Sequence, residues 1–329
     1  MKYKINREFF PYSKLKPPLS KSVIKMAQKV MGPPKFFFKD KSLIIDKIQF
    51  PTYDDELISS YIISPISLLD NSPCIIYFHG GGFVFEAANY HYKLAMEYAK
   101  KTNSKVFFIK YRLSPRLKLP EIVMDTYYAF KYIYNNNNLF NIDINNFALA
   151  GDSAGGFLAA NLTSLLKKEN INIKCQLLVY PFLDNSLSSE STKTFTDTPM
   201  WNSKLSVKIL EYILPDGIKY TSPIAHKDYT DFPPTYIEIA EYDSLKDDGK
   251  LYHKLLKNYN VETELYEIPG TMHGFDIKYN AKTSIDAINN RISFLNKHLN
   301  QCWHILNSVV KYSWLAITNY KKEVLICQS

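Results

Sequence analysis

The chain has 329 residues, of which 46% are hydrophobic and 15% aromatic, so it can bury a large core and is not a disordered polymer. Its formal net charge is +8, and no stretch approaches the roughly 18 uncharged apolar residues that a membrane-spanning helix needs. The first residues are basic but have no apolar run behind them, so we expect no secretory signal. Four cysteines without CxxC pairs or metal-ligand spacing favour a reduced, cytoplasmic protein with neither disulfides nor a metal.

Most of the positive charge lies in residues 1–42, which we call the N-terminal segment. It has eleven Lys or Arg against two acids, a net charge of +9, which leaves −1 for the rest of the chain. A helix is expected from Ser20 to Met31, because Gly32 and two prolines end the pattern there. Aromatic residues accompany the charge, namely Phe9, Phe10, Tyr12, Phe36, Phe37 and Phe38.

The charge and the aromatic residues of the N-terminal segment allow two hypotheses. In one, the segment makes a peripheral contact with an anionic membrane surface. In the other, it is a solvated basic face of a segment that packs across the body of the protein. No recognised motif for nucleic-acid binding accompanies the charge, so we expect no nucleic-acid partner.

From residue 43 to 299 the chain alternates β-rich runs with helix-period stretches, which is typical of an α/β fold with a mostly parallel sheet flanked by helices. Continuous apolar runs such as IIYF and LLVY suit central strands covered on both faces. Strands are predicted at 42–50, 57–65, 73–79, 105–111, 147–152, 175–181, 235–241 and 262–268. Helices are predicted near 90–102, 120–135, 154–168, 246–258 and 282–299.

Two further regions interrupt or follow this alternation. Residues 182–232, which we call the insertion, separate two predicted strands and contain a predicted helix within 198–216. Long insertions in compact domains are often lids, so a functional role is expected. Residues 300–329 form a tail with amphipathic spacing, to which we assign no role and which leaves a homodimer as an open hypothesis.

The hexapeptide Gly151-Asp152-Ser153-Ala154-Gly155-Gly156 directly follows a predicted strand and opens an apolar helix. A G-x-S-x-G motif in this setting is typical of a nucleophile elbow, which raises the serine oxygen above the sheet at a helix N-terminus. The turn is too tight for side chains at its flanks, hence the glycines. Such a motif also arises by chance, and Ser153 would then be only a helix cap.

The run His79-Gly80-Gly81-Gly82-Phe83 follows another predicted strand. Successive glycines let the backbone bend so that N–H groups point into one space, as an oxyanion hole requires. We predict Gly81, Gly82 and Ala154 as the N–H donors. A phosphate-binding loop is the alternative, but no Lys-Ser/Thr pair follows the glycines.

A serine nucleophile needs a base, and His273 is the best placed, on a glycine-flanked loop after the last predicted strand. The other histidines are weaker candidates: His79 more plausibly braces the glycine loop, His226 lies in the insertion, His253 and His298 are expected on exposed helix surfaces, and His304 lies in the tail.

The acid that orients the base should lie between the serine and the histidine in chain order. Asp243 sits just past the predicted strand 235–241 and is favoured. Asp247 and Asp248 are competitors, but they are better explained as the first turn of the next helix, where the helix dipole favours acids.

Together, these motifs resemble the hormone-sensitive-lipase group of α/β-hydrolase esterases, known for HGGG and GDSAGG motifs. The resemblance covers roughly residues 40–299. The matching segments, in the family's order, are His79 to Phe83, Tyr111-Arg112-Leu113-Ser114-Pro115, Gly151 to Gly156, Tyr180-Pro181, Pro233-Pro234, Asp243 to Gly249 and His273-Gly274-Phe275.

The resemblance implies an α/β-hydrolase domain at 43–299, with the triad Ser153, Asp243 and His273. It also implies a cap built from residues 1–42 and 182–232. Arg116 stands where the family commonly has an acid, which affects a local ion pair but not the triad.

We therefore expect a serine carboxylesterase that acts on a small-molecule ester by two-step acyl transfer, without cofactor. The resemblance implies short to medium acyl chains, and Phe83, Trp201 and Leu205 are the predicted lining of the acyl pocket. One rival is an amidase or deacetylase with the same triad. The other is a non-catalytic module that binds a small molecule on the same fold.

Overall fold

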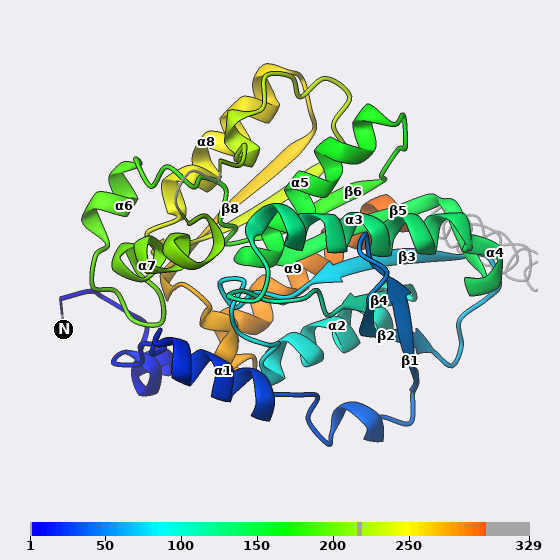
Figure 1. The fold of residues 1–329 in the computed structure, drawn as a ribbon, viewed down its shortest axis with the longest axis horizontal. Helices are drawn as coiled ribbons and strands as arrows, with labels where there is room; N and C mark the ends of the chain where they lie inside the picture. The colour runs from blue at the N-terminus through cyan, green and yellow to red at the C-terminus, as the bar shows by residue number, and fades with distance from the viewer. Residues whose placement is uncertain (1, 216–218, 301–329) are drawn as a thin grey trace, which may run out of the picture.

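The fold is described from a computed structural model, for residues 2–215 and 219–300 (Figure 1). The predicted amphipathic tail lies outside these residues, apart from Asn300. An eight-stranded sheet forms the centre of the molecule, in the order β1-β2-β4-β3-β5-β6-β7-β8. Its strands are β1 Leu43–Pro51, β2 Leu57–Pro65, β3 Ser72–Phe78, β4 Lys105–Ile109, β5 Ile142–Asp152, β6 Cys175–Val179, β7 Thr235–Tyr242 and β8 Thr263–Met272.

The sheet is parallel from β4 through β8, while β1 and β2 add to one edge as antiparallel strands. The predicted mostly parallel sheet is therefore confirmed. All eight predicted strands form, but β5 starts earlier and β8 continues further than expected. Pro269 and Gly270 lie within β8, and their composition favours a turn, which explains why its last residues were not predicted.

Helices cover both faces of the sheet (Figure 1). Residues of α2 and α9 pack on one face, and residues of α3, α5 and α8 pack on the other. The helices are α1 Lys21–Val30, α2 Asn89–Thr102, α3 Leu119–Asn135, α4 Asn137–Phe140, α5 Ala154–Lys168, α6 Glu190–Thr194, α7 Ser203–Ile213, α8 Lys246–Asn258 and α9 Lys282–Leu299. Short 3-10 helices are η1 Arg7–Tyr12, η2 Phe37–Lys39, η3 Pro223–Ala225 and η4 Phe275–Lys278.

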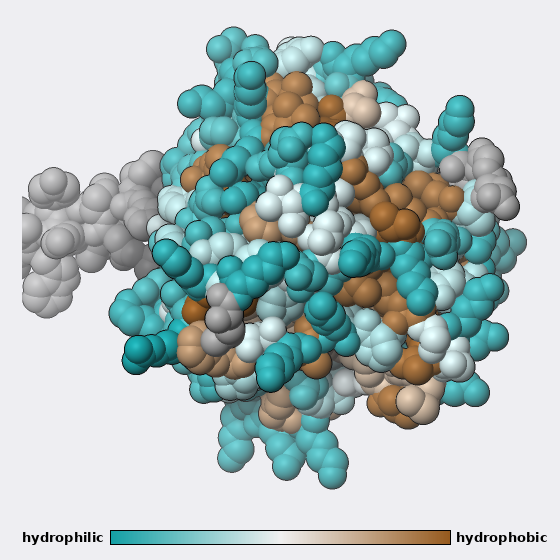
Figure 2. Space-filling view, turned by 90° about the vertical axis from the view of Figure 1, so that its left-hand side faces the viewer, coloured by the Kyte–Doolittle hydropathy of each residue, from teal (hydrophilic) through white to brown (hydrophobic). Residues whose placement is uncertain are grey.

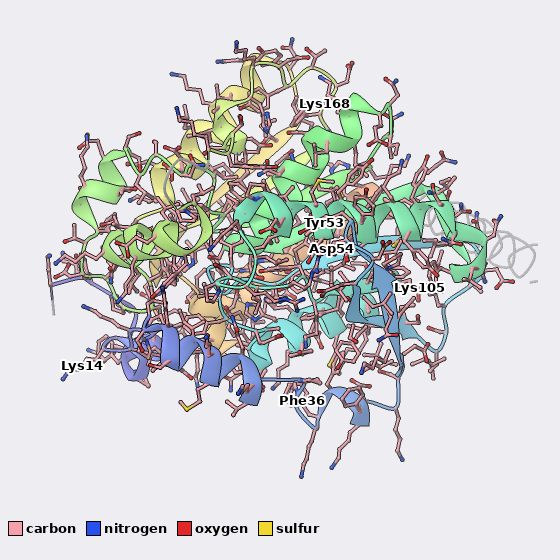
Figure 3. All side chains as sticks on the ribbon, viewed as in Figure 1. Lys14, Phe36, Tyr53, Asp54, Lys105 and Lys168 are labelled. Atoms are coloured by element: carbon pink, nitrogen blue, oxygen red, sulfur yellow. The ribbon has the colours of Figure 1, made fainter. Side chains whose placement is uncertain are left out.

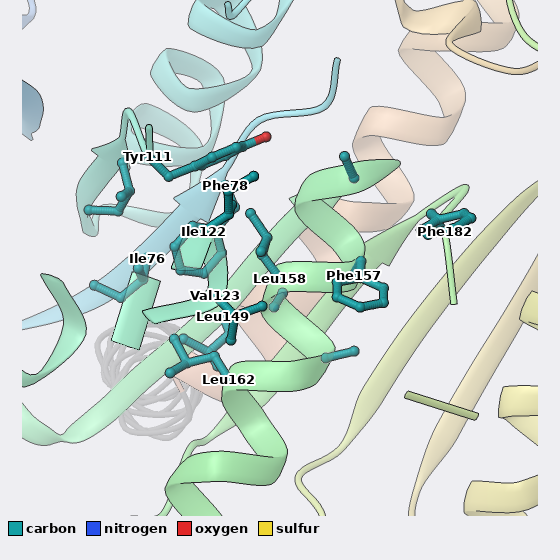
Figure 4. Close-up of a cluster of buried hydrophobic side chains, with 14 of the residues drawn as sticks. Ile76, Phe78, Tyr111, Ile122, Val123, Leu149, Phe157, Leu158, Leu162 and Phe182 are labelled. Carbon is teal, nitrogen blue, oxygen red and sulfur yellow. The ribbon is translucent and has the colours of Figure 1, made fainter. Parts of the chain in front are cut away.

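The two faces of the sheet have separate hydrophobic clusters, and β3 shows how one strand serves both. Ile76 and Phe78 belong to the cluster beneath α3 and α5, whereas Ile75 and Tyr77 belong to the cluster beneath α2 and α9. Alternate side chains of a strand point to opposite faces, so a continuous apolar run is what a doubly covered strand requires. Figure 4 shows the first cluster, with residues of β3 and β5 packed against those of α3 and α5.

The N-terminal segment and the insertion pack against each other at one side of the sheet (Figure 1). The N–H of Met200 donates to the carbonyl of Leu15, and the hydroxyl of Tyr212 donates to the carbonyl of Leu19 at 2.9 Å. The predicted helix of the N-terminal segment is α1, and the hydroxyl of Ser20 caps it by accepting from the N–H of Val23. The predicted domain limits stay a prediction.

Among residues 2–215 and 219–300, no helix combines the length and the apolar character that crossing a bilayer would demand. The described cysteines, Cys74 and Cys175, are both buried free thiols.

Candidate active site

Ser153 lies at the tight turn between β5 and α5. Its φ of 54° and ψ of −117° are strained for a residue with a side chain, as expected of a nucleophile held at a sharp turn. The N–H of Ser153 donates to the carbonyl of Val179 at 2.9 Å, and its carbonyl accepts from the N–H groups of Phe157 and Phe182. These bonds hold the strained turn against β6 and α5.

The glycines that flank Ser153 are required by close approach of the backbone. A Cβ on Gly151 would lie 2.2 Å from the carbonyl oxygen of Gly155. A Cβ on Gly155 would lie 1.9 Å from the carbonyl oxygen of Phe78, at the end of β3. Both distances are far below any contact that real side chains make, so the turn admits only glycine at these two positions.

The structure brings the three residues of the predicted triad together from three separate loops. The Nε2 of His273 lies 2.8 Å from the Oγ of Ser153, and its Nδ1 lies 2.7 Å from the Oδ2 of Asp243. All three side chains are buried or nearly so. A Nδ1–H that donates to Asp243 leaves Nε2 free to accept the serine proton, which is the arrangement a general base needs.

The carboxylate of Asp243 is fixed by a second contact, because its Oδ1 accepts from the N–H of Leu245 at 3.0 Å. Neither of the two competing acids contacts His273 among the described residues. Asp247 accepts from the N–H of Ser191 at 2.7 Å, and both Asp247 and Asp248 lie in the first turn of α8, as predicted. The geometry therefore favours Asp243 as the partner of His273.

The glycine loop after β3 lies next to the nucleophile. Gly82 and Ala154 line the same small cavity as Ser153, whereas Gly81 is not among its lining residues. Gly81 and Gly82 have φ of 120° and 60°, a region that favours glycine. Their role and that of Ala154 as oxyanion donors stays a prediction.

The loop is anchored from below by Asp152, the residue before the nucleophile. Its Oδ2 accepts from the N–H of Gly80 at 3.1 Å and lies 3.0 Å from the Nε2 of His91. Its Oδ1 accepts from the hydroxyl of Tyr77 at 2.7 Å. Burial alone would raise the pKa of Asp152, but attraction to His91 and the hydrogen bonds from His91 and Tyr77 hold it below its ordinary value.

His79 braces the same loop, as the sequence predicted. Its Nδ1 lies 2.6 Å from the carbonyl oxygen of Gly80, and its ring stacks on Tyr111. The hydroxyl of Tyr111 donates to the carbonyl of His79 at 2.7 Å. Burial and the neighbouring His91 lower the pKa of His79 to about 3, so the imidazole is neutral at pH 7 and acts as a rigid support.

The loop that carries His273 is held by a second buried network. The guanidinium of Arg291, in α9, contacts Glu238 of β7 and Asp276 of η4, with 3.0 Å from Nε to Glu238 and 2.9 Å from Nη2 to Asp276. The hydroxyl of Tyr180 donates to Asp276 at 2.8 Å, and the ring of Tyr180 lies 4.9 Å from that of His273. Arg291 and its two acids are fully buried, so their charges are paired within the protein.

The cavity beside Ser153 is apolar and tight. The cavity has a volume of about 10 Å³, which is roughly enough for one water molecule. Of the three predicted pocket residues, Phe83 and Trp201 line it, but Leu205 does not. Leu205 packs instead against the hydrophobic core, and Ile209, one turn further along α7, faces the cavity. The complete lining is Gly82, Phe83, Ser153, Ala154, Phe182, Trp201, Ser206, Ile209 and Leu245.

Trp201 closes the cavity over the glycine loop. Its Cη2 would lie 2.7 Å from a Cβ on Gly82, its ring lies 6.1 Å from that of His273, and its indole N–H donates to Ser206 at 2.9 Å. The larger grooves on the described surface lie elsewhere, between the N-terminal segment, α2 and α9, and none of the triad residues lines them.

The remaining histidines of the described residues lie away from Ser153. The prediction that His298 is exposed was wrong, because it is buried against Phe294 on the inner side of α9. His253 is half-buried, with its Nδ1 3.2 Å from the hydroxyl of Thr263. His304 lies outside the described residues.

Two groups of supporting residues were missed by sequence reasoning. Asp152 is the variable position of the G-x-S-x-G pattern, and an acid at the end of an apolar predicted strand was the available signal. His91 and Arg291 lie in helices, and nothing in their local sequence marks them as partners of residues 61 and 53 positions away. A lone arginine on the apolar face of α9 was the available signal for the second network.

Known proteins resemble this chain in sequence and in fold. Residues 75–277 match the family described as alpha/beta hydrolase fold. A putative alpha/beta hydrolase of Acanthamoeba polyphaga mimivirus is 34% identical over 230 residues, which are 68% of this chain and 66% of that protein, just under two thirds of its length.

Two similar proteins carry esterase names. Carboxylesterase NlhH of Mycobacterium tuberculosis is 30% identical over 219 residues, which are 64% of this chain and 69% of that protein. The solved structure of a bacterial heroin esterase has a TM-score of 0.74 and 26% identity, over 84% of this chain and 89% of its own. The expected α/β-hydrolase fold and the resemblance to esterases are thus confirmed.

Proposed function

The chain belongs to the α/β-hydrolase fold family as an esterase-type, hormone-sensitive-lipase-like member, and from this premise we propose that it hydrolyses carboxylic esters by two-step acyl transfer. The observation that carries the proposal is the continuous chain of contacts from Ser153 through His273 to Asp243, with distances of 2.8 and 2.7 Å. Every group to which we assign a role in the reaction is a side chain or a backbone N–H of this protein.

In the first step, the Nε2 of His273 accepts the proton of the Ser153 hydroxyl as its oxygen attacks the ester carbonyl. Asp243 holds the imidazole by its Nδ1–H and stabilises the charged ring. The N–H groups of Gly82 and Ala154, with Gly81 beside them, bind the negative oxygen of the tetrahedral intermediate. His273 then protonates the leaving alcohol, and an acyl group remains on Ser153.

In the second step, His273 removes a proton from a water molecule that attacks the acyl-enzyme. The carboxylic acid leaves, and the proton returns to Ser153. The neutral imidazole is needed at the start of both steps, because only an unprotonated Nε2 can accept the proton of Ser153 or of water.

We propose short to medium acyl chains as substrates. The tight cavity, lined by Phe83 and Trp201, supports the short end of this range. We also propose a cytoplasmic location, which the buried, unpaired thiols of Cys74 and Cys175 support.

The test is hydrolysis of p-nitrophenyl esters from acetate to long acyl chains, by wild type and Ser153→Ala in parallel. We expect a peak at a short acyl chain and a loss of about 10⁴-fold or more in the variant. Ser164→Ala is the matched control, because Ser164 lies on the same helix but its hydroxyl bonds only the carbonyl of Ala160 among the described residues.

Three results would contradict the proposal or redirect it. No turnover by folded wild type would favour the non-catalytic binding module. Turnover that survives Ser153→Ala would show another nucleophile. Faster hydrolysis of an amide than of the matched ester would favour the amidase or deacetylase.

A further inference from the structure

The cations of the N-terminal segment are almost all without an acidic partner. Of its eleven Lys and Arg residues, only Lys2 forms an ion pair within the described part of the chain, with Asp197. The two acids of the segment are used for other contacts. Glu8 accepts from the N–H groups of Lys282 and Thr283 at the start of α9, and Asp40 pairs with Lys100. Ten positive charges of the segment are therefore exposed and without an ion pair to any residue that the structure describes.

Helix α1 presents these charges beside exposed apolar side chains. Its inner face is anchored by Ile24, which is fully buried. On its outer face, lysines recur every four residues, and an adjacent ridge carries Met26 and Val30, which are 60% and 75% exposed. The three lysines of the outer face are Lys21, Lys25 and Lys29.

Further exposed apolar residues lie on both sides of α1. Phe10, Leu15 and Phe38 are 41%, 45% and 54% exposed. Scattered apolar residues are normal on a protein surface, and Figure 2 shows them interspersed with hydrophilic ones on the side where the insertion lies. Here, however, they share a 42-residue segment with ten cations that have no acidic partner among residues 2–215 and 219–300.

We propose that the N-terminal segment docks on an anionic lipid surface, with α1 lying in the plane of the interface. Lysines are attracted to anionic headgroups, while Met26 and Val30 enter the apolar boundary below them. A nucleic acid would use the charges but would leave these two aliphatic side chains in water, so a lipid surface fits both properties of the helix.

The docking segment also contacts the loops of the candidate active site. Gln28 of α1 donates at 2.8 Å to the carbonyls of Val84 and Ser114, next to the glycine loop. The N–H of Asn6 donates to the carbonyl of Gly270, near the end of β8 and three residues before His273. Docking would thus hold the site at the lipid surface, a consequence that rests on the proposed function, whereas docking itself does not.

Deletion of the whole segment would break these contacts, so point variants of exposed residues are the better test. The experiment is co-sedimentation of the full chain with vesicles of phosphatidylcholine alone or with about one third phosphatidylglycerol, at low and high salt. The charge variant is Lys21→Glu/Lys25→Glu/Lys29→Glu, and the apolar variant is Met26→Ser/Val30→Ser.

The matched control for charge is Lys168→Glu/Lys254→Glu/Lys257→Glu. It changes the net charge by the same amount at exposed lysines with no ion pair within the described residues. These lysines belong to α5 and α8, on the other side of the molecule from α1; Figure 3 labels Lys14 and Lys168 at opposite sides.

We expect wild type and control to bind the anionic vesicles and not the neutral ones. The charge variant should partition at least about 100-fold more weakly at low salt, since loss of each lysine near an anionic surface costs about a factor of five and each new glutamate adds repulsion. The apolar variant should bind at low salt but be released by less salt than wild type.

Absence of wild-type binding to anionic vesicles would overturn the proposal, as would equal loss in the charge variant and its control. Binding of the wild type to single-stranded RNA or duplex DNA, lost in the charge variant while vesicles are ignored, would replace it with a nucleic-acid partner. Ester hydrolysis by unbound protein is measured separately, so failure of docking is distinguishable from failure of the proposed function.

Discussion

Two aspartate–histidine pairs meet at the nucleophile elbow, and they differ in what the second imidazole nitrogen contacts. In the pair Asp243–His273, that nitrogen lies 2.8 Å from Ser153 Oγ. In the pair Asp152–His91, it accepts the backbone N–H of Ala88 at 2.8 Å. The second nitrogen of His273 therefore faces the hydroxyl of Ser153, which lines the cavity. Both nitrogens of His91 instead contact groups that hold the glycine loop and the start of α2.

The comparison shows that pairing alone does not make a histidine a base. Both pairs are buried, and their N–O distances are similar, at 2.7 and 3.0 Å. The two histidines differ in their position in the fold. His273 directly follows β8, the edge strand of the sheet, whereas His91 lies in the first turn of α2. We infer that the first pair serves catalysis and the second supports the glycine loop.

The largest effect is expected from Asp243→Asn. An amide would donate to the imidazole Nδ1 and so favour the tautomer with a proton on Nε2, which cannot accept from Ser153. The value of kcat should fall about 10⁴-fold, with little change in Tm. Steady-state hydrolysis of a short p-nitrophenyl ester measures the loss, and activity within tenfold of wild type would refute the assignment of Asp243.

His91→Ala should affect stability more than chemistry. It leaves the carboxylate of Asp152 buried with its main partner removed, which costs about 3–5 kcal/mol of unfolding free energy. Gly80 then loses a firm anchor, and we expect a loss of about 10- to 100-fold in kcat/KM. Urea unfolding and ester hydrolysis measure the two effects.

His253→Ala is the matched control for His91→Ala, because the only hydrogen bond described for that imidazole is with Thr263. If His91→Ala instead unfolded like wild type and lost as much activity as Asp243→Asn, the roles given to the two pairs would be wrong.

Asp248 differs from Asp243 and Asp152, because its buried carboxyl has no histidine or other cation beside it among the described residues. Its Oδ2 has no hydrogen-bond partner, and burial together with nearby carboxylates raises its pKa to about 7. Between about pH 4 and 7, the folded state keeps a proton on Asp248 that the unfolded state has already lost. The free energy of unfolding therefore falls as pH rises through that range.

Asp248→Asn should remove this pH dependence. We expect unfolding free energy to be higher than that of wild type by roughly 1–4 kcal/mol at pH 8, and similar at pH 4. Urea unfolding across this range measures it. A variant less stable than wild type at pH 8 would show that the charged carboxylate is stabilised in the fold.

The smallest effect is expected from Tyr77→Phe. The change removes one hydrogen bond to Asp152 but keeps the contacts of the ring with Tyr98 and Phe108, and His91 and Gly80 still donate to the carboxylate. We expect a loss of about 1–2 kcal/mol in unfolding free energy and less than threefold in kcat/KM. A loss as large as that of His91→Ala would make the hydroxyl, rather than the imidazole, the main partner of Asp152.

The order of strands and helices, and the residues of the triad, followed from the sequence because each depends on local chemistry. A G-x-S-x-G turn between a strand and a helix has one geometry, since Gly151 and Gly155 leave no room for a Cβ. Residues just past the ends of parallel strands gather at one edge of the sheet, so Asp243 and His273 could be predicted as neighbours of Ser153.

The tertiary structure decided which side chains meet from distant elements. Whether Leu205 or Ile209 faces the cavity depends on how α7 is rotated about its axis, and a hydrophobic pattern tolerates either. The partners His91 for Asp152 and Arg291 for Asp276 come from helices that reach these acids only after packing on the sheet. Sequence thus determined which three residues meet beside the elbow, because turns and strand ends are local. Packing determined the residues that support them, because burial and hydrogen bonding depend on the whole fold.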